Sequence, residues 1–171
     1  DMSRYRLRSV GMIFQSFNLI PTMTARENVS LALAFAGLSK SDRRRHSAEL
    51  LDRVGLSQRA DHLPSELSGG MRKRIGLART LITDPKIMLY DEPTTGLDPA
   101  TSREISELIL KMKDKHKVSS INVTHDMECA KLTADRIVVL KDGVYICEGT
   151  FEELQKSDDP FVKSFFEGLN F

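Results

Sequence analysis

The sequence predicts an α/β fold built on a largely parallel sheet, with a small helical lobe inserted into it. Three short runs of β-branched and apolar residues support this prediction, namely Ser9–Phe14, Lys86–Tyr90 and Ser119–Val123. Segments with helical periodicity and capping residues separate each run from the next. Strands that alternate with helices pair in parallel, because each crossover helix returns the chain to the same end of the sheet.

The segment 24–67 is predicted to form the inserted lobe. Thr24 and Glu27 make a capping box that opens an apolar helix. A second, amphipathic helix is expected from Ser41 to Val54. A chain of 171 residues fits one domain together with such a lobe, so the α/β core is assigned to residues 1–23 and 68–171.

The second half of the chain continues the alternation. Three helices are predicted, over Ser68–Thr83, from Asp98 to about Lys117 and around Met127–Leu132. They are followed by a hairpin of Arg136–Leu140 and Val144–Cys147, with its turn at Asp142-Gly143. Two short helices, which begin at Thr150 and at Asp159-Pro160, end the pattern. The last helix places Phe161, Phe165 and Phe166 on one face. That face would pack either on the protein's own core or on a partner.

Composition and charge exclude several classes of protein. The 25 basic and 24 acidic residues give a net charge of +1, so we expect no general attraction to nucleic acid. The longest apolar stretch, Val29–Leu38, is shorter than the roughly 20 residues that a membrane-spanning helix needs. No signal peptide is recognisable, and Cys129 and Cys147 are expected to be free thiols in a reducing compartment. The sequence therefore predicts a cytosolic protein.

Leu67-Ser68-Gly69-Gly70-Met71 is the first of four segments that indicate chemistry. It opens a predicted helix whose first N–H groups have no partner within the helix. Two glycines allow a ligand to approach the backbone closely, and the Ser68 hydroxyl adds a donor, so the segment suits a phosphate group. Taken alone, the same residues are more often a flexible helix entry.

The acidic pair Asp91-Glu92 follows the predicted strand Lys86–Tyr90. Ligands of α/β sheets bind at the carboxyl ends of the strands. A carboxylate there can hold Mg²⁺, usually through water, and its neighbour can orient an attacking water. An exposed acidic pair at a strand end is the alternative.

Asp98 and His125 complete the four segments. Asp98 lies in Thr95-Gly96-Leu97-Asp98-Pro99, where the ordinary role of an aspartate is to cap a helix. We expect Asp98 to serve both as this cap and as a functional residue of the site. His125 follows a predicted strand, where it can donate to a developing negative charge. A structural role is the alternative for a single histidine.

Together with Gln15, these segments resemble the ATP-binding cassette (ABC) family in order and spacing. LSGGM resembles the signature motif, IMLYDE the Walker B strand, TGLD the D-loop, THD the H-loop and Gln15 the Q-loop. The resemblance covers essentially the whole chain and implies a P-loop NTPase-like, RecA-like core. It implies ATP and Mg²⁺ as ligands and an ATPase working as a pair of subunits, in most cases a homodimer.

The resemblance also assigns roles to individual residues. Ser68, Gly69 and Gly70 would bind the γ-phosphate of ATP held by the second subunit. Glu92 would be the general base, and Asp98 would couple the subunits. The remaining assignments are Asp91 as a magnesium ligand through water, Gln15 in the shell of the metal and the nucleophile, and His125 as a contact to the γ-phosphate.

One departure from the family pattern is prominent. No segment of the chain matches G-x-x-x-x-G-K-[ST], the loop that cradles the β- and γ-phosphates, and the upstream aromatic that stacks on adenine in this family is missing too. The chain also begins at Asp1 rather than at a methionine. We therefore expect an N-terminally incomplete subunit that would by itself be inactive as an ATPase.

Two subgroups of transporters share features with the chain. Residues 1–37 are similar to ATPases of the lipoprotein-release and macrolide-export group. From Gly69 onward the sequence is similar to Mce/Mla-type phospholipid transport ATPases in three segments: GGMRKRIGLART, the DPATS helix, and DDPFVKSFFEG near the end of the chain. In the first of them, Met71 and the basic run 72–74 replace the usual glutamine-rich stretch. The second resemblance favours envelope lipid transport, with the first group as the alternative.

Two further hypotheses are a non-transport ABC protein and a regulatory, non-catalytic cassette. Repair proteins of the family carry a long coiled coil before the signature, whereas only 52 residues separate Gln15 from Ser68 here. Glu92 and His125 argue against a degenerate cassette. The resemblance thus implies a peripheral protein on the cytoplasmic face of the inner membrane, bound to an integral permease and to an Mce-type lipid-binding protein, with no nucleic acid. We expect the permease to dock between the core and the 24–67 lobe.

Overall fold

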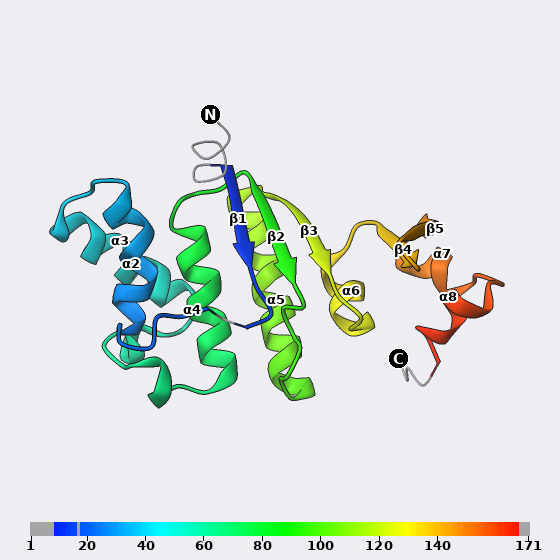
Figure 1. Ribbon diagram of the computed structural model, residues 1–171, viewed down its shortest axis with the longest axis horizontal. Coiled ribbons are helices and arrows are strands. Elements are labelled where there is room, and N and C mark those ends of the chain that lie inside the picture. The colour runs from blue at the N-terminus through cyan, green and yellow to red at the C-terminus, as the bar shows by residue number, and fades with distance from the viewer. Residues whose placement is uncertain (1–8, 17, 168–171) are drawn as a thin grey trace.

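The computed structural model describes residues 9–16 and 18–167. Figure 1 shows three neighbouring parts: a pair of helices at one end, a sheet with its covering helices in the middle, and a hairpin with two short helices at the other end. The predicted α/β class is confirmed, because the middle part is a parallel sheet whose strands are joined by helices. In the described part of the chain, no helix combines the length and the apolar character needed to cross a membrane.

The central sheet has the strand order β1-β2-β3, formed by Val10–Ile13, Ile87–Asp91 and Ser119–Val123. Both pairings are parallel, with Ile13 opposite Tyr90 and Asp91 opposite Val123. Met88 and Tyr90 of the central strand are buried, as expected for a strand with a neighbour on each side. All three strands end at the same edge, so the residues that follow them are neighbours.

Helices α4 (Gly69–Leu81) and α5 (Pro99–His116) pack beside the sheet, and α6 (Met127–Thr133) follows β3. Gly11 explains how close α4 comes to β1. A Cβ atom at this position would lie 2.4 Å from Cγ2 of Thr80 and 2.7 Å from Sδ of Met88. Only glycine fits there, so the helix is seated directly on the backbone of the strand.

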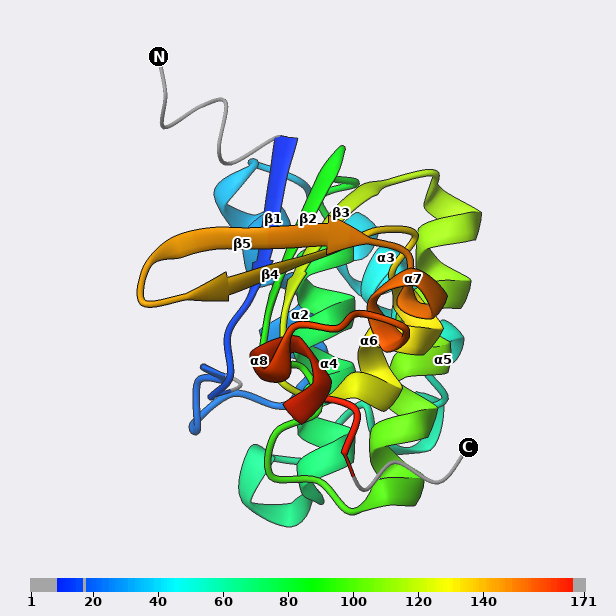
Figure 2. The ribbon, with the colours of Figure 1, turned by 90° about the vertical axis from the view of Figure 1, so that its right-hand side faces the viewer.

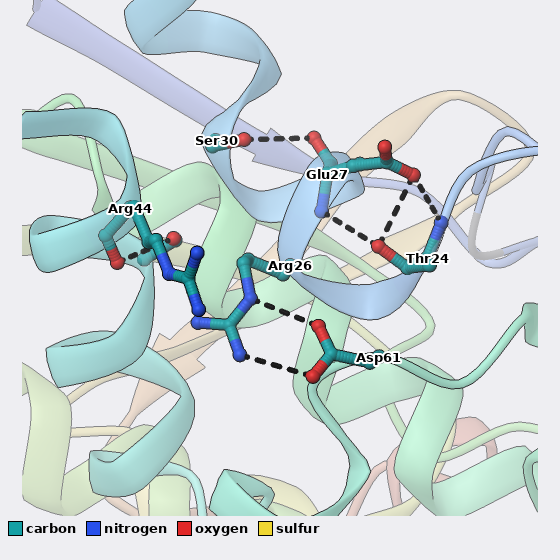
Figure 3. A network of polar contacts seen from close by, with 7 residues as sticks. Thr24, Arg26, Glu27, Ser30, Arg44 and Asp61 are labelled. Carbon is teal, nitrogen blue, oxygen red and sulfur yellow. Dashed lines mark hydrogen bonds and ion pairs between the residues drawn. The ribbon is translucent and has the colours of Figure 1, made fainter. Parts of the chain in front are cut away.

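The predicted lobe contains α2 (Ala25–Phe35), α3 (Lys40–Arg53) and two short 3-10 helices, Ser57–Arg59 and Pro64–Glu66. Figure 3 shows the predicted capping box at the start of α2, in which the side chains of Thr24 and Glu27 bond reciprocally to each other's backbone N–H. Beside it, Arg26 forms a two-pronged ion pair with Asp61, which fastens the loop after α3 to α2. Whether 24–67 acts as a separate subdomain stays a prediction.

The C-terminal part is the predicted hairpin of β4 (Ile137–Lys141) and β5 (Val144–Gly149), followed by α7 (Phe151–Gln155) and α8 (Pro160–Ser164). Figure 2 shows the hairpin crossing the direction of the three parallel strands. Asp142 and Gly143 at its turn both have positive φ, which is the geometry that an Asp-Gly turn supplies. Cys129 is buried and Cys147 half-buried, both as free thiols.

The aromatic residues near the C-terminus pack on their own hairpin. Phe161 and Phe165 make an edge-to-face contact with ring centroids 5.2 Å apart, and Phe166 meets Phe151 at the same distance. These rings surround a small core that contains Val139, Leu154 and Val162. The helix α8 is only five residues long. Of the two alternatives for this aromatic face, the structure therefore supports packing within the protein.

One face of the sheet is partly apolar and exposed. Strand β3 pairs with β2 alone among the described residues, and its outward side chains Ile121 and Val123 are 62 % and 61 % exposed. A groove of about 620 Å³ lies between β3 and β4, whose Val138 and Leu140 are also exposed. Side chains alternate between the two faces of a strand, so Ile121 and Val123 show that one face of the sheet is uncovered here.

Candidate functional site

The carboxyl ends of the three parallel strands bring four of the predicted site residues together. Asp91 is the last residue of β2 and Glu92 follows it, Gln15 comes two residues after β1, and His125 comes two residues after β3. Because the strands are parallel and in register, these positions share one edge of the sheet. In Figure 1 the amino ends of α4 and α5 lie on the same, lower side of the molecule.

Glu92 has an unusual backbone conformation that directs its side chain. Its φ is +48°, in the left-handed region that non-glycine residues seldom adopt. Its N–H donates to the carbonyl of Val123 at 2.9 Å, which extends the β2–β3 pairing by one step. Its own carbonyl accepts from the N–H of Thr95 at 3.3 Å. Strain of this kind is concentrated at functional sites, where the surrounding contacts maintain it.

The Glu92 carboxylate accepts hydrogen bonds from three side chains. Thr95 Oγ1 donates at 2.9 Å and Thr124 Oγ1 at 3.4 Å, both to Oε2, and Nδ1 of His125 donates to Oε1 at 2.8 Å. The glutamate side chain is 19 % exposed and the histidine side chain 73 % exposed. The carboxylate is thus held by its partners but lies beside an accessible imidazole.

The pKa values of this pair move in opposite directions. Burial raises the pKa of Glu92, but the hydrogen bonds from His125 and Thr95 together with the histidine charge outweigh it, and the net pKa is lowered. The hydrogen bond from Glu92 and its charge raise the pKa of His125, against a smaller opposing effect of burial. Both shifts favour a carboxylate paired with an imidazolium, so Glu92 carries its negative charge at neutral pH.

Asp91 and Gln15 suit a magnesium ion. The Asp91 side chain is half-buried, and no side-chain or backbone group in the described ranges donates a hydrogen bond to its carboxylate. The Gln15 side chain is exposed at the end of the neighbouring strand. One carboxylate and one amide oxygen fit Mg²⁺, which keeps several waters and takes few protein ligands. No cluster of three or more acidic, histidine or cysteine residues occurs within 9–16 and 18–167, so the protein would supply only these few oxygens.

Ser68, Gly69 and Gly70 form the first turn of α4. Ser68 is the N-cap and accepts from the N–H of Met71 at 3.3 Å. A Cβ atom on Gly70 would lie 2.6 Å from Cγ2 of Thr101 in the first turn of α5. The second glycine of the motif therefore allows the amino ends of the two helices to touch.

Asp98 is the N-cap of α5, the ordinary role expected for it. It accepts from the N–H of Thr101 at 3.0 Å and from the Thr101 hydroxyl at 2.6 Å, and these bonds lower the pKa of Asp98. A contact of Asp98 with a second subunit stays a prediction.

Two polar contacts at this site were not anticipated from the sequence. Thr94, which is buried, donates to Asp126 at 2.7 Å and so joins the loop after Glu92 to the segment that holds His125. Lys73 donates from Nζ to the carbonyl of Glu92 at 3.0 Å and to that of Gln15 at 3.1 Å.

From charge alone, the basic run 72–74 predicts a solvated helix face in preference to a site for an acidic partner, and for Lys73 this prediction is wrong because the residue is only 3 % exposed. A signal was present in the sequence. Lys73 lies three and four positions from Gly70 and Leu77, both buried, so helical spacing places it on the inward face of α4.

Comparison with known proteins follows the same motifs. A family model described as "ABC transporter" matches residues 1–95. The chain belongs to the ABC transporter family. It is 43 % identical over 150 residues to the methionine import ATP-binding protein MetN of Streptococcus pyogenes serotype M28 (strain MGAS6180), and 44 % identical over 154 residues to MetN of Streptococcus pneumoniae (strain ATCC BAA-255 / R6).

Solved structures of this ABC family share the fold. Two dimeric structures of the cassette MJ0796 superpose with a TM-score of 0.78 at 38 % identity, one of them titled a post-hydrolysis state bound to ADP and Pi. They cover 88 % of this chain, which confirms the predicted P-loop NTPase-like core. The chain spans 66 % of these structures and 42 % to 44 % of the MetN proteins.

Among the residues predicted from the ABC resemblance, the structure brings Gln15, Asp91, Glu92 and His125 to one edge of the sheet. Ser68–Gly70 and Asp98 lie at the amino ends of the neighbouring helices α4 and α5. Their assigned roles stay predictions.

Proposed function

We propose that this chain is the larger part of an ATP-hydrolysing domain of an ABC transporter subunit, with Glu92 as the general base. The observation that carries the proposal is the Glu92 carboxylate at the carboxyl edge of the sheet, ionised and fixed by Thr95, Thr124 and His125. Glu92 would take a proton from the water that attacks the terminal phosphorus of ATP, and ADP would leave with the electrons of the cleaved P–O bond.

The other site residues bind and orient. Asp91 and Gln15 would hold Mg²⁺, which when bound neutralises phosphate charge. His125 keeps Glu92 as a carboxylate and places an imidazolium at the reaction edge. Ser68, Gly69 and Gly70 would contact the γ-phosphate of ATP on a second subunit, and dimeric structures of a related cassette support this arrangement.

The position in the cell follows from the same family. We place the protein on the cytoplasmic face of a membrane, with an integral permease docked between the core and the 24–67 lobe. Membership of the ABC transporter family supports this placement. The aromatic C-terminal segment does not add to it, because its rings pack on their own hairpin.

Two cargoes have support from different observations. The names of the MetN relatives favour uptake of methionine or a similar small solute. The Mce/Mla-like residues Met71, 72–74 and 158–168 favour lipid transport. We favour a small solute, because the 43 % to 44 % identity extends over 86 % to 90 % of this chain, whereas the lipid hypothesis rests on short segments and one of them, 72–74, holds a buried structural lysine.

Replacement of the general base tests the activity. Glu92→Gln in the intact protein should keep ATP binding, since the amide has the same shape, and should lower turnover by about 10²- to 10⁴-fold because general-base catalysis contributes that much. Glu152→Gln, at an exposed glutamate of α7, is the matched control and should turn over at the wild-type rate. Wild-type turnover by Glu92→Gln would remove this residue as the base.

Isolation of the membrane complex tests the cargo. A permease that binds the ATPase together with a solute-binding protein for amino acids would support the small-solute proposal. A complex that contains an Mce-type lipid-binding protein would establish the lipid alternative. A lipoprotein-release or drug-efflux permease would contradict both and leave the ATPase proposal untouched.

A further inference from the structure

Lys73 is a buried lysine at the meeting point of three functional segments. It lies in the second turn of α4, directly after the glycines of the signature-like motif, and is 3 % exposed. Its Nζ donates to the carbonyl of Gln15, which is 58 positions away in the chain, and to the carbonyl of Glu92, which is 19 positions away. Both acceptors are backbone atoms of residues assigned to the reaction.

The surroundings of Lys73 give no packing reason for a lysine. A small void beside it is lined by Ile13, Leu77, Tyr90 and Pro93, which are apolar or aromatic. A buried ammonium loses its hydration, and this burial lowers the pKa of Lys73, against the opposing charges of Glu92 and Asp91. A methionine would fill the same space without that cost. What the lysine adds is a charged donor that reaches two carbonyls at once.

The two carbonyls fix conformations that are otherwise unfavourable. Glu92 has a φ of +48°, and its carbonyl also accepts the N–H of Thr95, so Lys73 braces the turn that aims the carboxylate. The loop that begins at Gln15 contains Asn18 with a φ of +44°. Helix α4 holds this loop a second time, because Arg79 donates to the Asn18 carbonyl at 2.6 Å.

We propose that Lys73 is a positioning residue that locks Gln15 and Glu92 to helix α4, so that the metal-binding amide and the general base keep a fixed separation during hydrolysis. This proposal deepens the proposed ATPase function and rests on it. Lys73 touches neither nucleotide nor water in this scheme, and it acts through the two peptide groups. A displacement of the signature-like end of α4 would move both reacting groups together.

Hydrogen exchange in the intact protein tests, independently of activity, whether Lys73 holds Gln15 and Glu92 to helix α4. In Lys73→Met, the amide of Thr95 should exchange its hydrogen about tenfold or more faster than in the wild type. This amide bonds to the same Glu92 carbonyl, which loses a charged donor in the variant. The amide of Ile20 donates to the Asn28 side chain and not to a Lys73 acceptor, so it should keep its protection and serve as an internal control.

Steady-state kinetics provide the second measurement. Lys73→Met should lower kcat by roughly 10- to 100-fold with little change of KM for ATP, since alignment of the base is lost and phosphate contacts remain. Lys73→Arg keeps the charged donors and should recover most of both effects. Lys111→Met, which removes an exposed lysine of α5, is the matched control for loss of a lysine and should behave as wild type.

Each outcome bears on the lock. Unchanged exchange at Thr95 and unchanged kcat in Lys73→Met would overturn it and leave Lys73 as a core residue. If Lys73→Met also loses protection of the Ile20 amide, the variant Lys73→Gln is measured instead. A folded Lys73→Gln protein with fast exchange at Thr95 supports the positioning role of Lys73, and one with slow exchange overturns it. A wild-type protein without ATP turnover would reject the proposed function, while the Thr95 exchange rates would still decide the lock.

Discussion

The contact between Gly70 and Thr101 yields a prediction whose size follows from the geometry. A methyl group added by Gly70→Ala would lie 2.6 Å from Cγ2 of Thr101, closer than carbon atoms approach in proteins. Threonine is stiff about χ1, and here its hydroxyl is held by Asp98 at 2.6 Å, so the side chain cannot turn away without losing that bond. The two helices must therefore separate.

The magnitude is a balance of two effects. In an unobstructed helix, alanine in place of glycine stabilises by roughly 0.5–1 kcal/mol. Forcing a methyl group into a filled contact costs typically about 1–3 kcal/mol. We expect Gly70→Ala to lower the free energy of unfolding by about 1–2 kcal/mol, measured by urea denaturation of the intact protein.

A double-mutant cycle identifies the cause. Thr101→Ser removes Cγ2 and keeps the hydroxyl that bonds to Asp98, so alone it should cost less than about 1 kcal/mol. In the presence of Thr101→Ser, Gly70→Ala should become neutral or stabilising, with a coupling of about 1–3 kcal/mol. The reasoning is refuted if Gly70→Ala is equally destabilising in both backgrounds, or if it is harmless in the wild type.

Three further predictions follow from the site and its supports. Asn28→Ala should destabilise by about 2–4 kcal/mol, because this buried side chain bonds to the backbone of Ile20, Met23 and Thr24, whereas Ser30→Ala on the same helix should stay within about 0.5 kcal/mol in the same unfolding assay. The pKa of His125, followed by NMR titration, should lie above its ordinary 6.5 and return toward it in Glu92→Gln. Because the pKa in the folded protein is raised, the stabilisation from the His125–Glu92 pair is complete below pH 6.5 and is lost as the pH rises through the raised pKa. A His125 pKa below 6.5 would contradict the pairing. Residues 1–171 alone, which contain no G-x-x-x-x-G-K-[ST] segment, should bind ATP weakly and hydrolyse none, and tight magnesium-dependent binding in a calorimeter would contradict this.

The sequence predicted the elements of the fold because the signals for them are local. Capping residues located the starts of α2 and α5, and the Asp142-Gly143 turn located the hairpin. Ser119–Val123 was predicted with the bounds that the structure shows. The limits of the other elements differ by one or two residues, because helix and strand ends depend on hydrogen bonds that the sequence pattern does not contain.

The candidate site could be predicted as a set of residues but not as an arrangement. Strand ends placed Gln15, Asp91, Glu92 and His125 together, because parallel strands share an edge. The positive φ of Glu92 and its contact with His125 depend on tertiary packing and left no local signal.

Lys73 was missed for a different reason. Charge and neighbouring basic residues suggested a solvated face, whereas helical spacing from Gly70 and Leu77 indicated the interior, and the tertiary contacts decided in favour of the interior.

The first two turns of α4 contact three of the predicted functional segments: the start of α5, the residue Gln15 and the turn at Glu92. Gly70 touches Thr101, which bonds to the Asp98 cap of α5, and three residues further on Lys73 bonds to Gln15 and Glu92. Three residues of an α-helix span only about 4.5 Å, so a ligand bound at the amino end of α4 acts within one turn of the lysine. Because these contacts are direct, either packed or charged, a shift of the helix at its amino end would also move Glu92. Phosphate binding at Ser68–Gly70 and proton abstraction at Glu92 are therefore expected to depend on each other, although they lie on different elements of the fold.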